Sequence, residues 1–141
     1  ETQDNQALVD ACNQAIENRN RENQGEDDIA SHGWVHKALV AARLKNADSC
    51  YNSLMALMSD NIYYTSLMTD HNTHDGWGVF CTDTSIGTIG IIDEMLLYSN
   101  TGVIEALPAL PDEWSEGSIE GLRARTNVEV DLEWTAENDH K

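Results

Sequence analysis

Basic residues are scarce in this sequence: eight Lys and Arg stand against 25 Asp and Glu, which gives a formal net charge of −17. Nucleic acid is therefore not an expected partner, because binding it needs a basic surface that releases counterions from the phosphates. The acidity also disfavours contact with anionic membranes, and no apolar run approaches the roughly 20 residues that cross a bilayer. We expect neither a nucleic-acid nor a membrane partner.

Cysteine is also scarce. Cys12, Cys50 and Cys81 are too few and too scattered for a disulfide scaffold, and their odd number leaves at least one thiol free or paired with another molecule. Free Cys is among the most frequently buried residue types, so we interpret these three as small buried side chains, with a disulfide as the alternative.

Several chemical signatures are missing. The sequence has no Gly-x-Ser-x-Gly elbow, no phosphate-binding glycine loop and no dinucleotide fingerprint. A metal site is conceivable, because His32 and His36 are spaced i, i+4 and the loop at 59–82 contains Asp70, His71, His74 and Asp75. Zinc needs three or four ligands in a defined geometry, and neither Cys-x-x-Cys nor His-Glu-x-x-His is present. We predict no metal and no cofactor.

The chain begins with Glu1 rather than Met, and neither a signal peptide nor a transmembrane segment can be recognised in it. We expect it to be part of a longer polypeptide, the remainder of which is then a partner of this chain. The compartment, extracellular or cytoplasmic in a bacterium, stays open.

The N-terminal half contains helical patterns. A first apolar stripe at helical spacing comprises Leu8, Ala11, Cys12, Ala15 and Ile16. Residues 17–28 are almost wholly polar and are predicted to form an exposed connection. A second helix is predicted to begin at Ser31, which can cap it, and to end near Lys45 or Asn46.

A third helix places Tyr51, Leu54, Met55 and Met58 on one face, with Asn46 or Asp48 available as its cap. Only a few residues separate it from the second helix, so the two are expected to pack as an antiparallel hairpin. Such a hairpin is the pattern expected of a fold in which inner and outer helices alternate.

Residues 59–82 show no sustained period but contain several aromatic residues, which is typical of a functional loop rather than plain disorder. The next helix, from about Ile86 to Tyr98, is apolar nearly all round, so we expect it to be covered on most sides.

The pattern changes after Thr101. Val128, Val130, Leu132 and Trp134 alternate with acidic residues, which predicts a strand with one buried face. Residues 119–125 are its predicted hairpin partner, with residues 126–127 near the turn. A lone two-stranded hairpin is marginal in water, so we expect it to lean on the helices or on further strands.

An ordered series of short motifs resembles glycoside hydrolase family 95, the inverting α-L-fucosidases that also include α-L-galactosidases. The motifs occur at residues 32–34, 41–44, 46–54, 87, 94–97, 107–111, 114, 117–118, 121–125 and 129–134. Where the family commonly has Phe-Gln-Ile-Asp-Gly-Asn, residues 80–85 read Phe-Cys-Thr-Asp-Thr-Ser, so the aspartate is retained and its neighbours differ.

The resemblance implies a mainly α fold, a partial (α/α)6 barrel of helical hairpins followed by a C-terminal β-hairpin or small β domain. Residues 1–100 would form the C-terminal portion of the catalytic barrel, and residues 101–141 a linker and the start of a β-sheet domain. It assigns Asp83 a part in activating the attacking water. In the family the general acid is an upstream glutamate, and asparagines assist the base. Neither the glutamate nor the asparagines are identified in this chain, so we expect the isolated chain to have little activity.

Asp83 has two interpretations from the residues themselves. It precedes the predicted helix by two or three residues, where backbone amides and the helix dipole favour an ionised carboxylate, as a general base requires. Asp is also a preferred helix cap, and Thr84 or Ser85 could share that task. The two roles are compatible.

The candidate substrate-binding residues are His32, Trp34, His71, His74, Trp77 and Thr84. His71 or His74 could hydrogen-bond sugar hydroxyls or a loop backbone. Trp34, Tyr64 and Trp77 could form platforms for a pyranose ring, although core packing is the commoner role of these residue types.

The leading hypothesis is thus that the chain is part of a glycoside hydrolase that acts on α-L-fucosides or related L-sugars in an oligosaccharide or glycan. One alternative is a non-catalytic acidic carbohydrate-binding or interaction module derived from such a barrel. Another is a different helical-barrel glycosidase or a phosphorylase, which phosphate dependence would distinguish.

Overall fold

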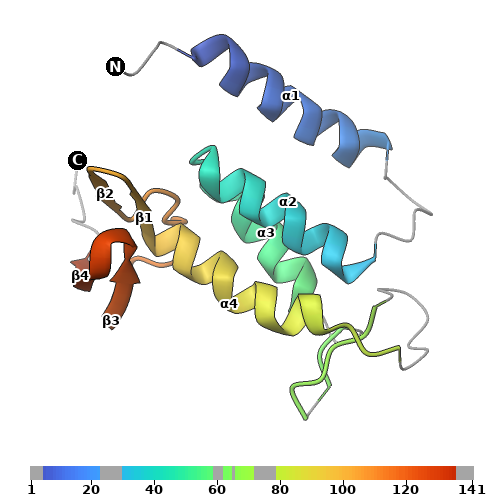
Figure 1. Ribbon diagram of the computed structural model, residues 1–141. Helices are drawn as coiled ribbons and strands as arrows, with labels where there is room; N and C mark the ends of the chain where they lie inside the picture. The colour runs from blue at the N-terminus through green and yellow to red at the C-terminus, as the bar shows by residue number, and fades with distance from the viewer. Residues whose placement is uncertain (1–4, 23–29, 59–61, 65, 72–78, 136–141) are drawn as a thin grey trace, which may run out of the picture.

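The computed structural model describes residues 5–22, 30–58, 62–64, 66–71 and 79–135. Helices come first and strands follow, as predicted. The helices are α1 (Gln6–Glu22), α2 (Ser31–Arg43), α3 (Ala47–Leu57) and α4 (Thr82–Leu96). Figure 1 shows α2, α3 and α4 packed together, with α1 on the side of α2. The closed barrel itself remains a prediction.

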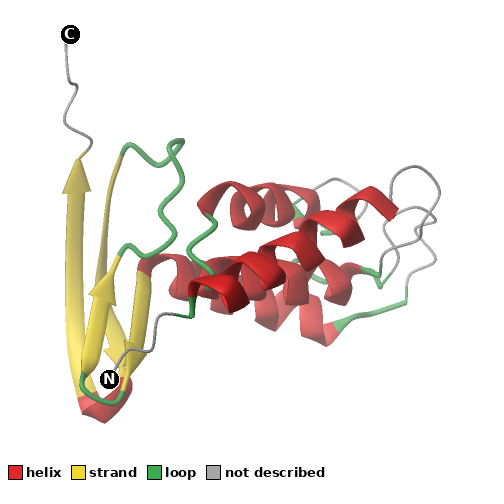
Figure 2. Ribbon diagram, turned by 90° about the horizontal axis from the view of Figure 1, so that it is seen from above, coloured by secondary structure: helices red, strands yellow, loops and turns green. Residues whose placement is uncertain are grey.

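Two antiparallel hairpins complete the fold. One pairs β1 (Leu97–Asn100) with β2 (Val103–Ala106), and the other pairs β3 (Glu116–Ala124) with β4 (Val128–Thr135). A short 3-10 turn, Arg125–Asn127, joins β3 to β4. Figure 2 shows the strands gathered at one end of the helices.

Helix α1 confirms the first predicted helix but continues through residues that were predicted to form a connection. Its polar half is supported by side-chain pairs one turn apart, such as Gln14 donating to Asn18. Of the apolar stripe, Ile16 is buried, whereas Leu8 is 62% exposed. The prediction that the connection begins at residue 17 was wrong, because the helix extends to Glu22.

Helices α2 and α3 form the predicted hairpin, and the Asn46 side chain caps α3 by accepting a hydrogen bond from Ser49 N at 3.0 Å. The core between α2, α3 and α4 combines small residues of α2 with larger side chains from the other two helices. Its fully buried members include Ala38, Ala41, Leu54, Leu57, Ile91 and Met95. Small residues on α2 allow the neighbouring helices to approach closely.

Helix α4 differs from its prediction at both ends. It begins at Thr82, so Asp83 lies inside its first turn rather than before it. It ends at Leu96, and the predicted last residues instead form β1. Ile86 and Ile89 are 71% and 65% exposed, so the expectation of a helix covered on most sides is not met within the described residues.

The β3–β4 hairpin confirms the predicted strand pair and its turn. A bulge between Ile119 and Leu122 contains Gly121, whose φ of +75° suits glycine and whose N–H donates to Asp131 Oδ1 at 2.8 Å. Trp134 Nε1 donates to Trp114 O at 2.9 Å. Since the Trp114 ring packs edge-on against Tyr51 of α3, the hairpin leans on the helices as expected.

Among the helices that the structure describes, none has both the length and the apolar character needed to span a membrane.

Candidate functional site

The chain that leads into α4 is held by a short ladder of hydrogen bonds. Isolated bridges pair Tyr63 with Thr69 and Asp70 with Phe80. Cys81 N donates to Thr69 O at 3.0 Å, and Thr69 Oγ1 donates back to Cys81 O at 2.5 Å. Both backbone polar groups of Cys81, the residue that precedes α4, are therefore fixed.

Asp83 is exposed at the second position of α4. The N-cap of this helix is Cys81, whose side chain makes no capping hydrogen bond, so Asp83 is not the N-cap residue. The Cys81 sulfur lies 4.0 Å from Asp83 Oδ2. The amides of a first helical turn lack intrahelical partners and carry the positive end of the helix dipole, which favours an anion at this position.

Thr84, the next residue, is fully buried. Its hydroxyl lies 2.5 Å from the hydroxyl of Ser31, the first residue of α2, and 3.3 Å from the Cys81 sulfur. In the described chain the Thr84 hydroxyl thus joins the N-terminal ends of α2 and α4. The contact between Thr84 and a substrate stays a prediction.

Two of the predicted histidines lie together at this end of the helices. The ring centroids of His32 and His71 are 5.0 Å apart, and the His36 ring lies 6.1 Å from His32. The backbone N–H of Ser31 donates to His71 O at 2.7 Å, which holds the His71 segment against the start of α2. The structure thus brings His32 and His71 to the end of the α2–α4 pair that carries Asp83.

His74 and Trp77, also predicted to bind substrate, lie outside the described residues, as does Asp75. Within the described part of the chain, no group of three or more His, Cys, Asp or Glu could hold a metal ion.

Comparison with known proteins supports the resemblance to glycoside hydrolase family 95. A family model, "Glycoside hydrolase family 95, C-terminal domain", matches residues 98–141. "Alpha-L-fucosidase 2" of Arabidopsis thaliana is 33% identical over 119 residues, which are 75% of this chain and 13% of that protein. "Probable alpha-fucosidase A" of Aspergillus oryzae is 29% identical over 117 residues, which are 74% of this chain and 16% of that protein.

Residues 98–141 therefore correspond to the C-terminal domain of glycoside hydrolase family 95, and the similarity to the two relatives extends over about three quarters of the chain. The chain spans 13% and 16% of the lengths of these two relatives.

Trp34 occupies a partly buried position on α2. It packs against the core, and Lys37 Nζ lies 4.3 Å from the centroid of its ring. Burial and, to a smaller extent, the positive charge of Arg19 lower the pKa of Lys37 below its usual value. Trp34 is thus already in contact with the core and with a cation, which favours the core-packing interpretation over an open sugar platform.

Asp70, which the sequence suggested only as a metal ligand, lies in the segment that contacts Ser31 at the start of α2. It is fully buried, and its Oδ2 accepts a hydrogen bond from Tyr64 Oη at 2.6 Å. The short separation of six residues between Tyr64 and Asp70 is the sequence feature that could have suggested this hydrogen bond. Tyr64, considered as a sugar platform, uses its hydroxyl in this contact.

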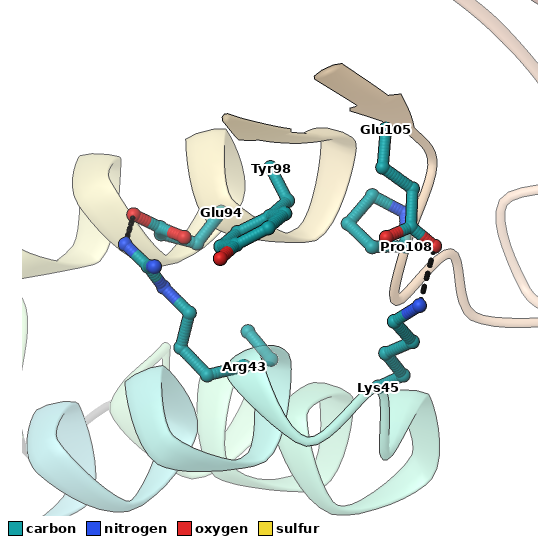
Figure 3. Close-up of a pocket in the computed structure, with 7 residues that line it drawn as sticks. Arg43, Lys45, Glu94, Tyr98, Glu105 and Pro108 are labelled. Carbon is teal, nitrogen blue, oxygen red and sulfur yellow. Dashed lines mark hydrogen bonds and ion pairs between the residues drawn. The ribbon is translucent and has the colours of Figure 1, made fainter. Parts of the chain in front are cut away.

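A hollow lined by both acidic and basic residues lies at the other end of α2 and α4. The hollow, of about 430 Å³, is lined by Ala42, Arg43, Lys45, Glu94, Tyr98, Glu105 and Pro108. Figure 3 shows two ion pairs on either side of Tyr98, Arg43 with Glu94 at 2.5 Å and Lys45 with Glu105 at 2.6 Å. Both ion pairs connect the α2–α3 hairpin to α4 or β2. They hold these elements together at the end of α4 that is remote from Asp83.

Proposed function

We propose that this chain is part of a glycoside hydrolase that cleaves α-L-fucosides, or related L-sugars such as α-L-galactosides, with inversion at the anomeric carbon. The observation that carries the proposal is an exposed aspartate, Asp83, in the first turn of a helix within a chain whose C-terminal part matches family 95. The names of both relatives, which describe α-fucosidases, support the choice of sugar.

The proposed role of Asp83 is to activate the attacking water. An inverting reaction needs a base on one side of the sugar and an acid on the other, with carboxyl groups about 6.5 to 9.5 Å apart so that a water fits between them. The helix N-terminus favours the ionised carboxylate, which is the form that accepts a proton from water.

Glu94 does not fit the role of the acid partner. It lies 11 positions beyond Asp83 on α4, which corresponds to roughly 16 Å along the helix axis. One of its oxygens is paired with Arg43. We therefore assign the general acid to a part of the longer polypeptide outside this chain.

The open side of α4 is consistent with this arrangement. Ile86 and Ile89 are more than half exposed, and apolar side chains of this size gain roughly 1.5 to 3 kcal/mol when fully buried. We propose that the remainder of the polypeptide covers them as an α/α barrel. Residues 1–100 would belong to that barrel and residues 101–141 to a linker and β domain.

The test uses the complete polypeptide and a nitrophenyl α-L-fucoside. Asp83→Asn keeps the size of the side chain but removes the base, and kcat is expected to fall about 10²- to 10⁴-fold. Asp93→Asn is the matched control, because Asp93 is also exposed on α4 and lies about 15 Å farther along the axis. NMR of the first product should show the β-anomer.

Near-normal hydrolysis by the Asp83→Asn variant would refute the catalytic role of Asp83. A glycan array that gives binding without hydrolysis, even for the complete polypeptide, would instead support a carbohydrate-binding module. Activity that depends on phosphate would identify a phosphorylase. Turnover by the isolated 141-residue chain would contradict the assignment of the acid to another part of the polypeptide.

A further inference from the structure

A pair of buried hydroxyl groups joins the residue after Asp83 to the start of α2. Thr84 and Ser31 are both fully buried, and their hydroxyl oxygens are 2.5 Å apart across the contact between α4 and α2. A buried hydroxyl is costly unless it is hydrogen-bonded, and each of these groups has one further partner, Asp70 O for Ser31 and the Cys81 sulfur for Thr84. The residue after Asp83 is therefore tied to a helix that lies more than fifty positions earlier in the chain.

The partners of Ser31 determine which hydroxyl donates in each hydrogen bond. Ser31 Oγ lies 2.7 Å from the backbone carbonyl of Asp70, which can only accept, so Ser31 donates its proton there. The Ser31 oxygen is then free to accept a hydrogen bond from Thr84. In this arrangement one serine connects the start of α2, the segment at Asp70 and the first turn of α4.

The backbone on both sides of Asp83 is hydrogen-bonded as well, and Thr84 N donates to Cys81 O at 3.3 Å. Thr88 Oγ1 donates to Thr84 O at 2.7 Å, one turn farther along α4. Upstream, Cys81 is fixed through its N–H and its carbonyl to Thr69. The exposed side chain of Asp83 therefore extends from a backbone that is hydrogen-bonded on both sides.

We propose that Ser31 and Thr84 form a positioning pair that holds the carboxylate of Asp83 in place for activation of the attacking water. This inference depends on the proposed function, in which Asp83 is the base. Displacement of a catalytic group by about 1 Å can cost on the order of 100-fold in rate. A hydrogen bond that fixes the neighbouring residue therefore acts on kcat rather than on substrate affinity.

The rest of α4 is anchored independently of this pair. Gly87 packs against Val35 of α2, and Ile91 and Met95 are fully buried in the core. Thr84→Val keeps the branched shape of the side chain but removes its hydroxyl. The helix should stay docked in this variant while its first turn loses its fixed orientation.

The experiment measures hydrolysis of a nitrophenyl α-L-fucoside by the complete polypeptide. Thr84→Val and Ser31→Ala are each expected to lower kcat about 10- to 100-fold. KM should change by less than about threefold, because binding in the ground state is not altered. Thr84→Ser retains the hydroxyl and should restore kcat to within about threefold of wild type.

A double-variant comparison separates positioning from general damage. Once Asp83→Asn has removed the carboxylate, adding Thr84→Val should lower the residual rate by less than about twofold, because no base remains to be misplaced. A further loss of the same factor as in the wild-type background would overturn the proposal. Unaltered kcat in both Thr84→Val and Ser31→Ala would also overturn it.

The outcomes distinguish this inference from the proposed function. If Asp83→Asn loses activity while Thr84→Val and Ser31→Ala keep full activity, the proposed function is supported and the positioning pair is refuted. If Asp83→Asn keeps full activity, both the proposed role of Asp83 and the positioning pair are refuted. If Thr84→Val does not fold, Ser31→Ala and Thr84→Ser decide the question, with the thermal midpoint of each variant as the measure of folding.

Discussion

The contact between α2 and α4 at Gly87 gives a sharp prediction for stability. A Cβ atom at Gly87 would lie 2.4 Å from Val35 Cγ1. Carbon atoms pack favourably at about 3.5 to 4.0 Å, so Gly87→Ala requires a movement of more than about 1 Å. Val is stiff at χ1 and cannot turn away freely, so we expect the helices to separate locally.

The net effect has two terms of opposite sign. Overpacking of a well-packed contact typically costs about 1 to 3 kcal/mol. Replacement of a helical Gly by Ala stabilises the folded state by roughly 0.5 to 1 kcal/mol. Gly90 offers a matched control on the same helix, because a Cβ atom at that position would meet no packing neighbour within 4 Å.

Urea unfolding should therefore show that Gly90→Ala stabilises the protein, whereas Gly87→Ala is less stable than Gly90→Ala by about 1 to 3 kcal/mol. Val35→Ala removes the methyl groups that clash and should recover part of the loss when combined with Gly87→Ala. Equal stabilisation by both alanine substitutions would show that the helices are not in contact at Gly87.

Two further predictions concern α3. Asn46→Ala removes the cap of this helix and should lower the free energy of unfolding by about 1 kcal/mol, whereas Asn46→Asp, which keeps a capping oxygen, should lose much less. Burial raises the pKa of Cys50 to about 12, only partly opposed by a backbone hydrogen bond from Ala42, so at pH 8 its thiol stays protonated. Peptide mapping after iodoacetamide treatment should find Cys50 unmodified in the folded protein and modified after denaturation, and equal rates in both states would contradict its burial.

The elements predicted well from the sequence are those with a strong period of their own. Helix α2, helix α3 with its Asn46 cap, and the β3–β4 hairpin each follow from apolar spacing and local turn residues. These signals are local, and the packed structure reinforces them. The apolar stripe of α1 likewise predicted a helix in the right place, although the polar residues that follow the stripe are helical as well.

The region from α4 to β2 was harder to predict because tertiary contacts decide it. Thr82 and its polar neighbours resemble a cap cluster, yet the hydrogen bond between Thr84 and Ser31 draws them into the first turn of the helix. At the other end the apolar run passes through Leu97 without interruption. The change from helix to strand there comes from pairing with Ala106, which the period of the run cannot reveal.

The candidate site shows the same division. Asp83 was found from its motif, but its surroundings depend on residues that are distant in sequence. Ser31 was predicted only as a cap for α2, and the structure gives its hydroxyl to Asp70 and Thr84 instead. No spacing rule connects positions 31 and 84, so this part of the site becomes visible only in three dimensions.

The exposed side of α4 connects the proposed chemistry to the proposed fold. Successive residues of a helix are about 100° apart, so Ile86, three positions after Asp83, projects from nearly the same side. That side lies away from the buried residues Thr84, Thr88 and Ile91. Any part of the longer polypeptide that covers Ile86 must therefore also approach Asp83. The surface that would bury the open face of α4 is thus the one that could supply a general acid and exclude bulk water, which is why we expect the site to be completed by the same contact that completes the barrel.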